Sequence, residues 1–242
     1  MIGLSMLESG EIVWINFMAY LRIVATPIGN LEDLSFRAKR TLTEADYILA
    51  EDTRVTQKLL NHYQIKTPTL SYHDHSGKMK VAKIKELLQA NKNLALVSDA
   101  GTPGISDPGS RLIEQLRKES DLEITIESIP GPSALSTSLA IAGTGFDQFL
   151  FLGFLPHKKG RQSLLKQIIA SEHSVVIYES KHRFLKLLTE LSSLNKELQL
   201  VVMRELTKIH ESVYQGSVLE VLTKFQTSPE ELKGEFVVLI KK

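Results

Sequence analysis

Short apolar runs alternate with amphipathic segments along almost the whole chain, and this order limits the possible folds more than any other feature. Most apolar runs are rich in Ile, Val and Leu and lack polar alternation, which is typical of strands buried on both faces. Strands that alternate with helices indicate an α/β fold with mainly parallel sheets. Strands are expected at 21–25, 47–50, 94–98, 123–129, 149–152, 174–178 and 199–203, and helices at 36–44, 55–63, 78–90, 111–118, 133–141, 161–171 and 184–194. The tail adds expected strands at 210–216 and 235–241 around a helix at 217–225.

A glycine-containing segment, Gly143 to Gly145, follows a helix of small residues and precedes a new strand, which favours a linker there. We therefore predict an N-terminal domain over 18–144 and a C-terminal domain over 145–242. Residues 1–17 contain the only Trp and two acids and lack the basic start and apolar core of a secretory signal. We predict that they form a disordered extension and that the protein is cytoplasmic.

Composition and charge remove several classes of function. The chain has no Cys, which excludes disulfides, thiolate metal sites and a Cys nucleophile. No apolar run approaches the roughly 20 residues that span a bilayer. Residues 1–150 hold 15 Lys and Arg and 18 Asp and Glu, whereas residues 151–242 hold 14 and 10, so the net charges are −3 and +4. The basic C-terminal part could face a polyanion, although an excess of this size also suits a solvated surface.

The most informative segment is the loop 98–109, Ser-Asp-Ala-Gly-Thr-Pro-Gly-Ile-Ser-Asp-Pro-Gly, between a predicted strand and a helix. Ligands of open α/β sheets bind beyond the carboxyl ends of the strands. Its glycines permit close approach of the backbone to a ligand. Asp99 and Asp107 offer acceptors for hydroxyl or ammonium groups, and Thr102 and Ser106 can bond a carboxylate or a ribose. The alternative is a tight loop in which Asp107 only caps the next helix.

Two further loops follow predicted strands. Residues 130–134, Pro-Gly-Pro-Ser-Ala, lead into a helix whose N-terminus suits a carboxylate, although Ser133 could serve only as a cap. Residues 26–30, Thr-Pro-Ile-Gly-Asn, follow the first predicted strand. Parallel strands would bring all three loops to one edge and form a polar cleft for a small amphoteric ligand. The chain lacks the G-x-G-x-x-G, P-loop, H-E-x-x-H and G-x-S-x-G motifs, so its residues alone do not identify that ligand.

A series of motifs resembles the tetrapyrrole methylase superfamily. The first set comprises residues 26–30, Glu51-Asp52-Thr53-Arg54, the loop 98–109 and residues 130–134. A second set narrows the resemblance to members that methylate a cytidine 2′-hydroxyl in the decoding region of bacterial 16S ribosomal RNA. This second set comprises Gly153-Phe154-Leu155-Pro156, Tyr178-Glu179-Ser180 with His182-Arg183, Arg204-Glu205-Leu206-Thr207-Lys208, and Lys233-Gly234-Glu235. The resemblance covers residues 21–242.

The resemblance implies two α/β domains, a homodimer, and S-adenosylmethionine folded into a cleft between the domains, without the Rossmann-type methyltransferase loop. It implies 16S ribosomal RNA or the 30S subunit as partner, with neither a membrane nor a metal. The residues it suggests for the cofactor are Pro27, Asp99, Ala100, Gly101, Thr102, Ser106, Pro132, Ser133, Ala134, Tyr178 and Glu235.

Catalysis is expected from the carboxyl end of the second strand. Methyl transfer from a sulfonium is an in-line displacement, so the protein mainly positions the reactants, and a base near the ribose hydroxyl would help. Glu51 or Asp52 could accept the proton and Arg54 could hold a phosphate, although the three could instead form a capping and ion-pair cluster. His73 and His75, after a third strand, are further candidates because neutral His can act as a base.

Contacts to RNA are expected from three basic clusters of the C-terminal part, the first two of which could instead contact the cofactor. They are His182 with Arg183, Arg204 with Lys208, and Lys158 with Lys159 and Arg161, the last of which could also be a solvated helix start. Two other functions fit the same fold: a corrin or porphyrin C-methyltransferase, and a ligand-binding domain without catalysis. The motifs at 51–54 and 178–183 and the basic C-terminal part favour the RNA enzyme.

Overall fold

The computed structural model describes residues 2–6, 12–16, 18–73, 76–119, 122–143 and 147–241, with side chains from residue 18 on. The chain forms two compact units: residues 1–27 with 31–132, and residues 28–30 with 133–242. The predicted domain boundary at 144–145 lies outside the described residues. The second unit begins before it, at Ser133, because helix α5 (Ala134–Ile141) packs its Leu135 and Leu139 on the second sheet.

The first unit is built on a five-stranded sheet in the order β5-β4-β6-β3-β7. All its strand pairs are parallel, which confirms the predicted fold class. The central strands are buried on both faces and apolar throughout, as in β6, Leu-Ala-Leu-Val. The strands are β3 (Ala19–Val24), β4 (Tyr47–Ala50), β5 (Thr69–Ser71), β6 (Leu94–Val97) and β7 (Ile124–Ile129).

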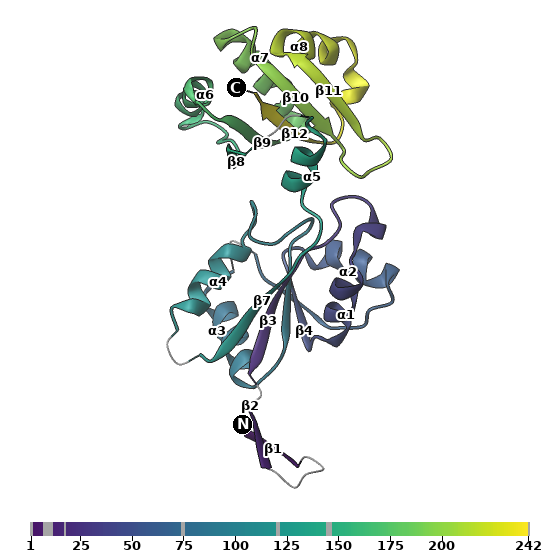
Figure 1. Cartoon of the computed structure of the whole chain (residues 1–242), viewed down its shortest axis with the longest axis vertical. Coiled ribbons are helices and arrows are strands. Elements are labelled where there is room, and N and C mark those ends of the chain that lie inside the picture. The colour runs from purple at the N-terminus through teal and green to yellow at the C-terminus, as the bar shows by residue number, and fades with distance from the viewer. Residues whose placement is uncertain are drawn as a thin grey trace. The chain divides into compact units, whose positions relative to one another are not determined.

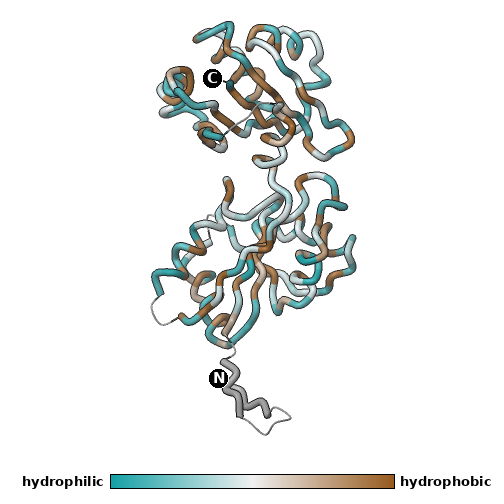
Figure 2. Tube along the Cα trace, viewed as in Figure 1, coloured by the Kyte–Doolittle hydropathy of each residue, from teal (hydrophilic) through white to brown (hydrophobic). Residues whose placement is uncertain are grey.

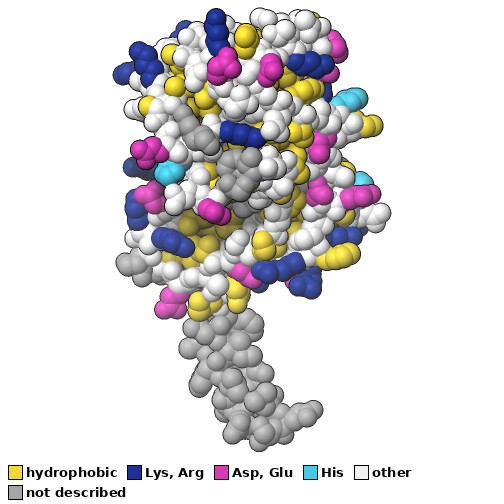
Figure 3. Space-filling view, turned by 45° about the horizontal axis from the view of Figure 1, so that its top comes forward, with side chains coloured by type: hydrophobic (Ala, Val, Ile, Leu, Met, Phe, Trp, Pro, Cys, Tyr) yellow, Lys and Arg dark blue, Asp and Glu magenta, His cyan; other side chains and the backbone are white. Residues whose placement is uncertain are grey.

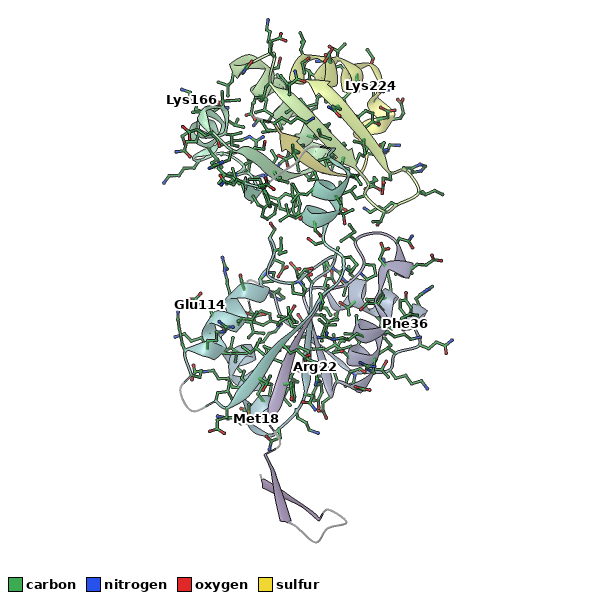
Figure 4. All side chains as sticks on the ribbon, viewed as in Figure 1. Met18, Arg22, Phe36, Glu114, Lys166 and Lys224 are labelled. Atoms are coloured by element: carbon green, nitrogen blue, oxygen red, sulfur yellow. The ribbon has the colours of Figure 1, made fainter. Side chains whose placement is uncertain are left out.

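Helices cover both faces of this sheet (Figure 1). Helices α1 (Phe36–Glu44) and α2 (Thr53–His62) bury their apolar sides against one face, through residues such as Leu42 and Leu60. Helices α3 (Lys78–Gln89) and α4 (Gly109–Arg117) do the same on the other face. Arg22 of β3, labelled in Figure 4, pairs with Glu127 of β7 at 3.1 Å and ties the edge strand to its neighbour.

The second unit has a mixed sheet in the order β11-β10-β12-β9-β8. Only β8 and β9 pair in parallel among its described strands, so this sheet departs from the expected mainly parallel arrangement. The strands are β8 (Phe149–Phe154), β9 (Ser174–Ser180), β10 (Gln199–Arg204), β11 (Ser212–Ser217) and β12 (Glu235–Ile240).

The main core of the second unit lies between one face of the sheet and helices α6 (Arg161–Ala170), α7 (Lys181–Leu194) and α8 (Val218–Thr227). The rings of Phe184 and Phe236 stack there at 3.9 Å, with Phe225 edge-on to Phe184. Helix α5 covers the opposite face. Figure 2 shows the trace of this unit with hydrophobic, brown segments among hydrophilic, teal ones. Short 3-10 helices occur at Leu31–Asp33 and Pro229–Leu232.

The first unit also includes two short strands at its N-terminal end. Strands β1 (Ile2–Met6) and β2 (Ile12–Asn16) pair in antiparallel register. This differs from the disordered extension that we expected for residues 1–17; β2, Ile-Val-Trp-Ile-Asn, is rich in the β-branched and aromatic residues that favour strands, whereas β1 is not. In the part of the chain that the structure describes, no helix is long and apolar enough to cross a membrane.

Candidate active site

The carboxyl ends of four parallel strands place polar loops at one edge of the first sheet. The loops are 26–27 after β3, 51–52 after β4, 98–102 after β6 and 130–132 after β7. The chain leaves β3 for α1 on one face and β6 for α4 on the other, which makes these neighbouring strands a topological switch point. Ligands of such sheets bind at this position.

The loop after β6 is fastened to the end of β3. Thr26 N donates to Gly101 O at 2.9 Å and Gly101 N to Thr26 O at 3.0 Å, which forms a bridge between the two chain segments. Buried Thr26 also donates its hydroxyl to Ser98 O at 3.3 Å. Gly101 has a φ of 83°, which favours glycine because other residues are strained there. The backbone beside Asp99 is therefore held in one conformation.

Asp107 organises the second half of the same loop. Its carboxylate accepts the Gly104 N–H at 2.8 Å and the Gly109 N–H at 2.7 Å, where α4 begins. A Cβ atom at Gly109 would lie 2.9 Å from Asp107 Oδ1 and 3.1 Å from Gly104 N. The N-cap residue of α4 is Pro108, and Asp107 directly before it accepts the N–H of the first helical residue, so the capping alternative that the sequence left open is realised from this position and uses much of the carboxylate.

Asp52 and Arg54 form a bidentate ion pair at the start of α2. Asp52 caps the helix by accepting the Arg54 N–H at 2.9 Å. The Arg54 guanidinium donates to both carboxylate oxygens, Nε to Oδ1 at 3.0 Å and Nη2 to Oδ2 at 2.6 Å. The side-chain hydrogen bond from Arg54 is the main cause that lowers the pKa of Asp52 to about 2. The capping and ion-pair alternative is thus realised, and Asp52 is a weak proton acceptor.

Asp99 lies beside this pair, but its pKa is shifted in the opposite direction to that of Asp52. Its Oδ1 accepts the Asp52 N–H at 2.9 Å, which links the ends of β4 and β6. Desolvation by the surrounding protein raises the pKa of Asp99, and the nearby Asp52 carboxylate adds to the rise. Among the described residues, no hydrogen-bond donor bonds its other oxygen, Oδ2. Asp99 is therefore the better placed of the two aspartates to bind an outside group.

The remaining predicted residues of the first unit lie at the same edge. Glu51 is half-buried directly after β4, and His73 follows β5, its N–H donating to Ser76 Oγ at 2.8 Å. His75 lies outside the described residues. Thr102 donates its hydroxyl to Pro132 O at 3.0 Å and so joins two of the loops. Pro27 is buried, whereas Ala100 and Ser106 are exposed, with Ser106 at a φ of 64°.

In the second unit, Tyr178 lies near the start of α5. Burial raises the pKa of its hydroxyl to about 12, against hydrogen bonds from the Leu135 N–H and the Ser133 hydroxyl. Tyr178 also makes edge-on contacts with Phe151 and Phe154, at 5.0 and 5.6 Å between ring centroids. Ser133 is buried and begins the helix, and Ala134 lies in its first turn. These predicted cofactor residues therefore belong to one packed cluster.

The basic residues after β10 are bound within the protein. Arg204 donates Nε to Lys233 O at 2.7 Å and Nη1 to His210 O at 3.1 Å. Lys208 pairs with Glu205 at 2.9 Å and with Glu235 at 2.8 Å. Arg204 and Lys208 were expected to contact RNA, but these bonds give them a structural task in the turn. Glu235, expected at the cofactor, contributes one of the pairs.

Two other basic residues differ more strongly from expectation. Arg161 is 3% exposed, so the idea that it faces RNA from a surface loop is wrong. Its guanidinium bonds Glu190 at 2.8 Å and lies 3.6 Å from Glu179. Arg183 bonds the same Glu179 through Nε at 2.7 Å. Lys158, Lys159 and His182 are exposed, as the prediction requires.

Three residues had structural tasks that the sequence reasoning missed. Buried Glu179 belongs to a cluster for which we expected contact with RNA or the cofactor, but it pairs with Arg161 and Arg183 instead. Glu205 has a φ of 52° and packs against Gly234, where a Cβ atom would clash at 2.5 Å. At Gly29 a Cβ atom would lie 2.4 Å from Lys208 Cγ. The sequence held a signal for the last two contacts, because each joins a glycine of one short motif to a charged residue of another. The fold brings Gly234 beside Glu205 and Gly29 beside Lys208.

Comparison with known proteins gives matches along nearly the whole chain. The family model described as Tetrapyrrole (Corrin/Porphyrin) Methylases matches residues 21–222. A Synechocystis protein named ribosomal RNA small subunit methyltransferase I is 45% identical over 225 residues, 92% of this chain and 79% of that protein. A Thermotoga maritima protein of the same name is 42% identical over 223 residues, 92% of this chain and 98% of that protein.

Solved structures with low sequence identity share the fold. A diphthine synthase gives a TM-score of 0.69 at 14% identity and covers 93% of this chain and 90% of its own. A Thermus thermophilus uroporphyrin-III C-methyltransferase, solved with S-adenyl homocysteine, gives 0.63 at 15% identity, with 91% and 96% covered. At these identities the likeness concerns the fold alone.

Proposed function

This chain belongs to the tetrapyrrole methylase family and is a methyltransferase, and we propose that it transfers a methyl group from S-adenosylmethionine to a cytidine 2′-hydroxyl in the decoding region of 16S ribosomal RNA. The main support for an RNA substrate is the 42% identity to the Thermotoga maritima ribosomal RNA methyltransferase, of which this chain covers 98%. Methylation of ribosomal RNA follows from these relatives. The cytidine and its 2′-oxygen are the finer part of the proposal and depend on the motifs at 178–183 and 204–208.

The residues of the first unit fit S-adenosylmethionine. Asp99 offers an open carboxylate oxygen at the switch point, which suits a ribose hydroxyl or an ammonium group. The left-handed Gly101 allows backbone groups to approach a ligand without a side chain between them. The cofactor supplies the activated methyl group when bound. Ser133, Ala134, Tyr178 and Glu235 of the second unit are also proposed as cofactor residues.

We assign the carboxylates of this edge to different tasks. A base with a pKa of about 2 has little tendency to take a proton from a ribose hydroxyl, so Asp52 positions Arg54 rather than acting as the acceptor. Arg54 is 88% exposed and can face a phosphate while Asp52 fixes its orientation. With Asp99 assigned to the cofactor, Glu51 is then the carboxylate that can receive the proton, with His73 further along the edge.

The test is methylation of defined substrates by the purified protein. Small ribosomal subunits from a strain lacking the enzyme should accept tritium from labelled S-adenosylmethionine, and mapping should place the product on a single ribose 2′-oxygen in the decoding region. A tetrapyrrole, uroporphyrinogen, should accept none. Transfer to the tetrapyrrole alone would contradict the proposal, and cofactor binding without transfer to either substrate would favour a ligand-binding role. Cytoplasmic location and a homodimer remain part of the proposal.

A further inference from the structure

Loop 156–160, Pro-His-Lys-Lys-Gly, is hydrogen-bonded to a buried network of ion pairs in the second unit. The network consists of Arg161, Glu179, Arg183 and Glu190, defined here as the loop-base network. Glu179 has no exposed side-chain surface and accepts both Nε and Nη2 of Arg183, at 2.7 and 3.0 Å. Glu190 accepts Nε of Arg161 at 2.8 Å. The charges of these four residues compensate each other, and exposed Lys186 also lies 3.9 Å from Glu190.

The network bonds the base of the loop directly. Arg183 Nη2 donates to Leu155 O at 2.9 Å, and Arg161 Nη1 donates to Pro156 O at 3.3 Å. Leu155 itself is buried. Arg161 N also donates to Lys158 O at 3.2 Å, and Gly160 turns the chain into α6 with a φ of 82°. The loop is therefore a turn of fixed conformation, because buried guanidinium groups bond the carbonyl groups where it begins.

The exposed side of the loop carries basic residues. His157, Lys158 and Lys159 are all exposed, and Lys158 and Lys159 make no ion pair among the described residues. They precede the N-terminus of the ten-residue helix α6, whose dipole adds positive potential. Lys181 and His182, exposed at the start of α7, lie at the same end of the sheet because β8 and β9 are parallel and Arg183 of α7 donates to Leu155 O after β8.

Elsewhere the charges are mixed. Figure 3 shows Lys and Arg side chains interspersed with Asp and Glu on the visible face. Arg204 and Lys208, at the same end of the sheet, are held by Lys233 O, His210 O, Glu205 and Glu235. The unpaired lysines of loop 156–160 thus differ from these neighbours. A rigid backbone reduces the entropy lost when flexible lysines bind a partner.

We propose that loop 156–160 is a preformed phosphate-binding tip for RNA, in which Lys158 and Lys159 contact the backbone while Arg161, Glu179, Arg183 and Glu190 only position it. The inference rests on the proposed function, because it takes ribosomal RNA as the polyanion. Lysine binds a phosphate as a point charge and needs no particular base. The tip should therefore contribute to affinity and salt dependence rather than to sequence recognition.

The first experiment measures binding of a 16S ribosomal RNA transcript over a range of KCl concentrations. The K158A/K159A variant should bind about tenfold more weakly, and its slope of log affinity against log salt should flatten by roughly 1 to 2. The matched control is K166A, which replaces an exposed lysine of the helix α6 that follows the loop (Figure 4) and should leave both the affinity and the salt slope unchanged. Equal behaviour of the two variants would overturn the tip as a phosphate site.

The second experiment tests whether the network acts through the tip. E190Q, which keeps both lysines, should weaken RNA binding about threefold in the wild-type background and have no effect in the K158A/K159A background. Equal losses in both backgrounds would show a merely structural role and overturn the positioning role. R161K, which keeps the charge but not the bonding geometry, replaces E190Q if that variant does not fold. No loss from either network variant would also overturn it.

The failure of this inference can be told from failure of the proposed function. If the wild-type protein methylates small subunits but the tip variants bind the transcript normally, only the tip is contradicted. If the wild-type protein transfers no methyl group to ribosomal RNA, the proposed function fails first. If the tip variants lose affinity for intact subunits but not for the naked transcript, the tip contacts an acidic protein surface, and the RNA assignment is overturned.

Discussion

At the scale of single residues, Asp52 uses one carboxylate for two tasks, a helix cap and an ion pair. Asp52→Asn keeps a capping oxygen but removes the charge that holds Arg54. We expect turnover to fall about tenfold because Arg54 loses its orientation. The shape of the pH profile between pH 5 and 8 should not change, because a pKa of about 2 lies far below that range. Single-turnover methylation checks this, and loss of an acidic limb in the variant would identify Asp52 as the base.

The same carboxylate predicts a pH effect on stability. The pKa of Asp52 is lowered from 3.8 to about 2 in the folded protein, so its ionised form stabilises the fold above the unfolded value. This contribution should be lost as the pH falls from about 4 through 2. The melting temperature of Asp52→Asn should therefore converge with that of the wild type as the pH is lowered from 5 to 2. A constant difference over this range would contradict the pairing with Arg54.

Asp99 gives a complementary prediction about the cofactor. Asp99→Ala removes the open carboxylate oxygen at the switch point and should weaken S-adenosylmethionine binding by about 1–3 kcal/mol. Glu51→Gln should leave that affinity nearly intact while reducing turnover, if Glu51 accepts the proton. Isothermal titration calorimetry on both folded variants separates the two roles. Unchanged affinity in the Asp99 variant would remove this residue from the cofactor site.

At the scale of elements, the sequence predicted strands and helices well where the apolar pattern was long. Helix α1 and strand β4 have the expected bounds. The short strand β5 could not be delimited, because three residues carry no periodicity. The antiparallel pairing of β10 with β12 was also hidden, since strands buried on both faces are apolar whether their neighbours are parallel or antiparallel. Strand direction depends on the connections between strands, which local composition does not encode.

Charged residues of the candidate site were harder to predict than its loops. The loop 98–109 was recognised from its glycines and its place after a strand. Arg161 was misjudged because it follows two exposed lysines and begins a helix, whereas its burial depends on Glu179 and Glu190 from distant segments. A buried arginine is tolerated only when such partners compensate its charge. Local sequence shows the charge but not its partners.

The cap at the start of α4 can be tested directly. Asp107→Ala removes the acceptor for the Gly104 and Gly109 N–H groups and should destabilise the first unit by about 1–3 kcal/mol. Glu114→Ala, on the exposed side of the same helix (Figure 4), removes only a surface pair with Lys118 and should change little. Urea unfolding compares the two. Equal effects would mean that Asp107 does not hold the loop.

At the scale of the whole molecule, the chain builds two separate units from one alternating pattern. It passes between the units at 27/28, 30/31 and 132/133. Ile28 joins the second core, and Asn30 N donates to Thr207 Oγ1 at 3.1 Å. The loop after β3 is thus divided between the two units. Its own sequence did not indicate this, because the division depends on partners such as Thr207, which lies 177 residues from Asn30 in the chain.

The strands β1 and β2 provide the last prediction. Within the described part of the chain they pair only with each other, whereas every strand of the two larger sheets belongs to a five-stranded ladder. An isolated two-stranded hairpin is marginally stable in water. A chain that begins at Met18 should therefore keep the melting temperature and the methylation rate of the full chain. The control is a chain that begins at Ile23, which removes most of β3 and should not fold. A clear fall in melting temperature for the Met18 chain would show that the hairpin supports the first unit.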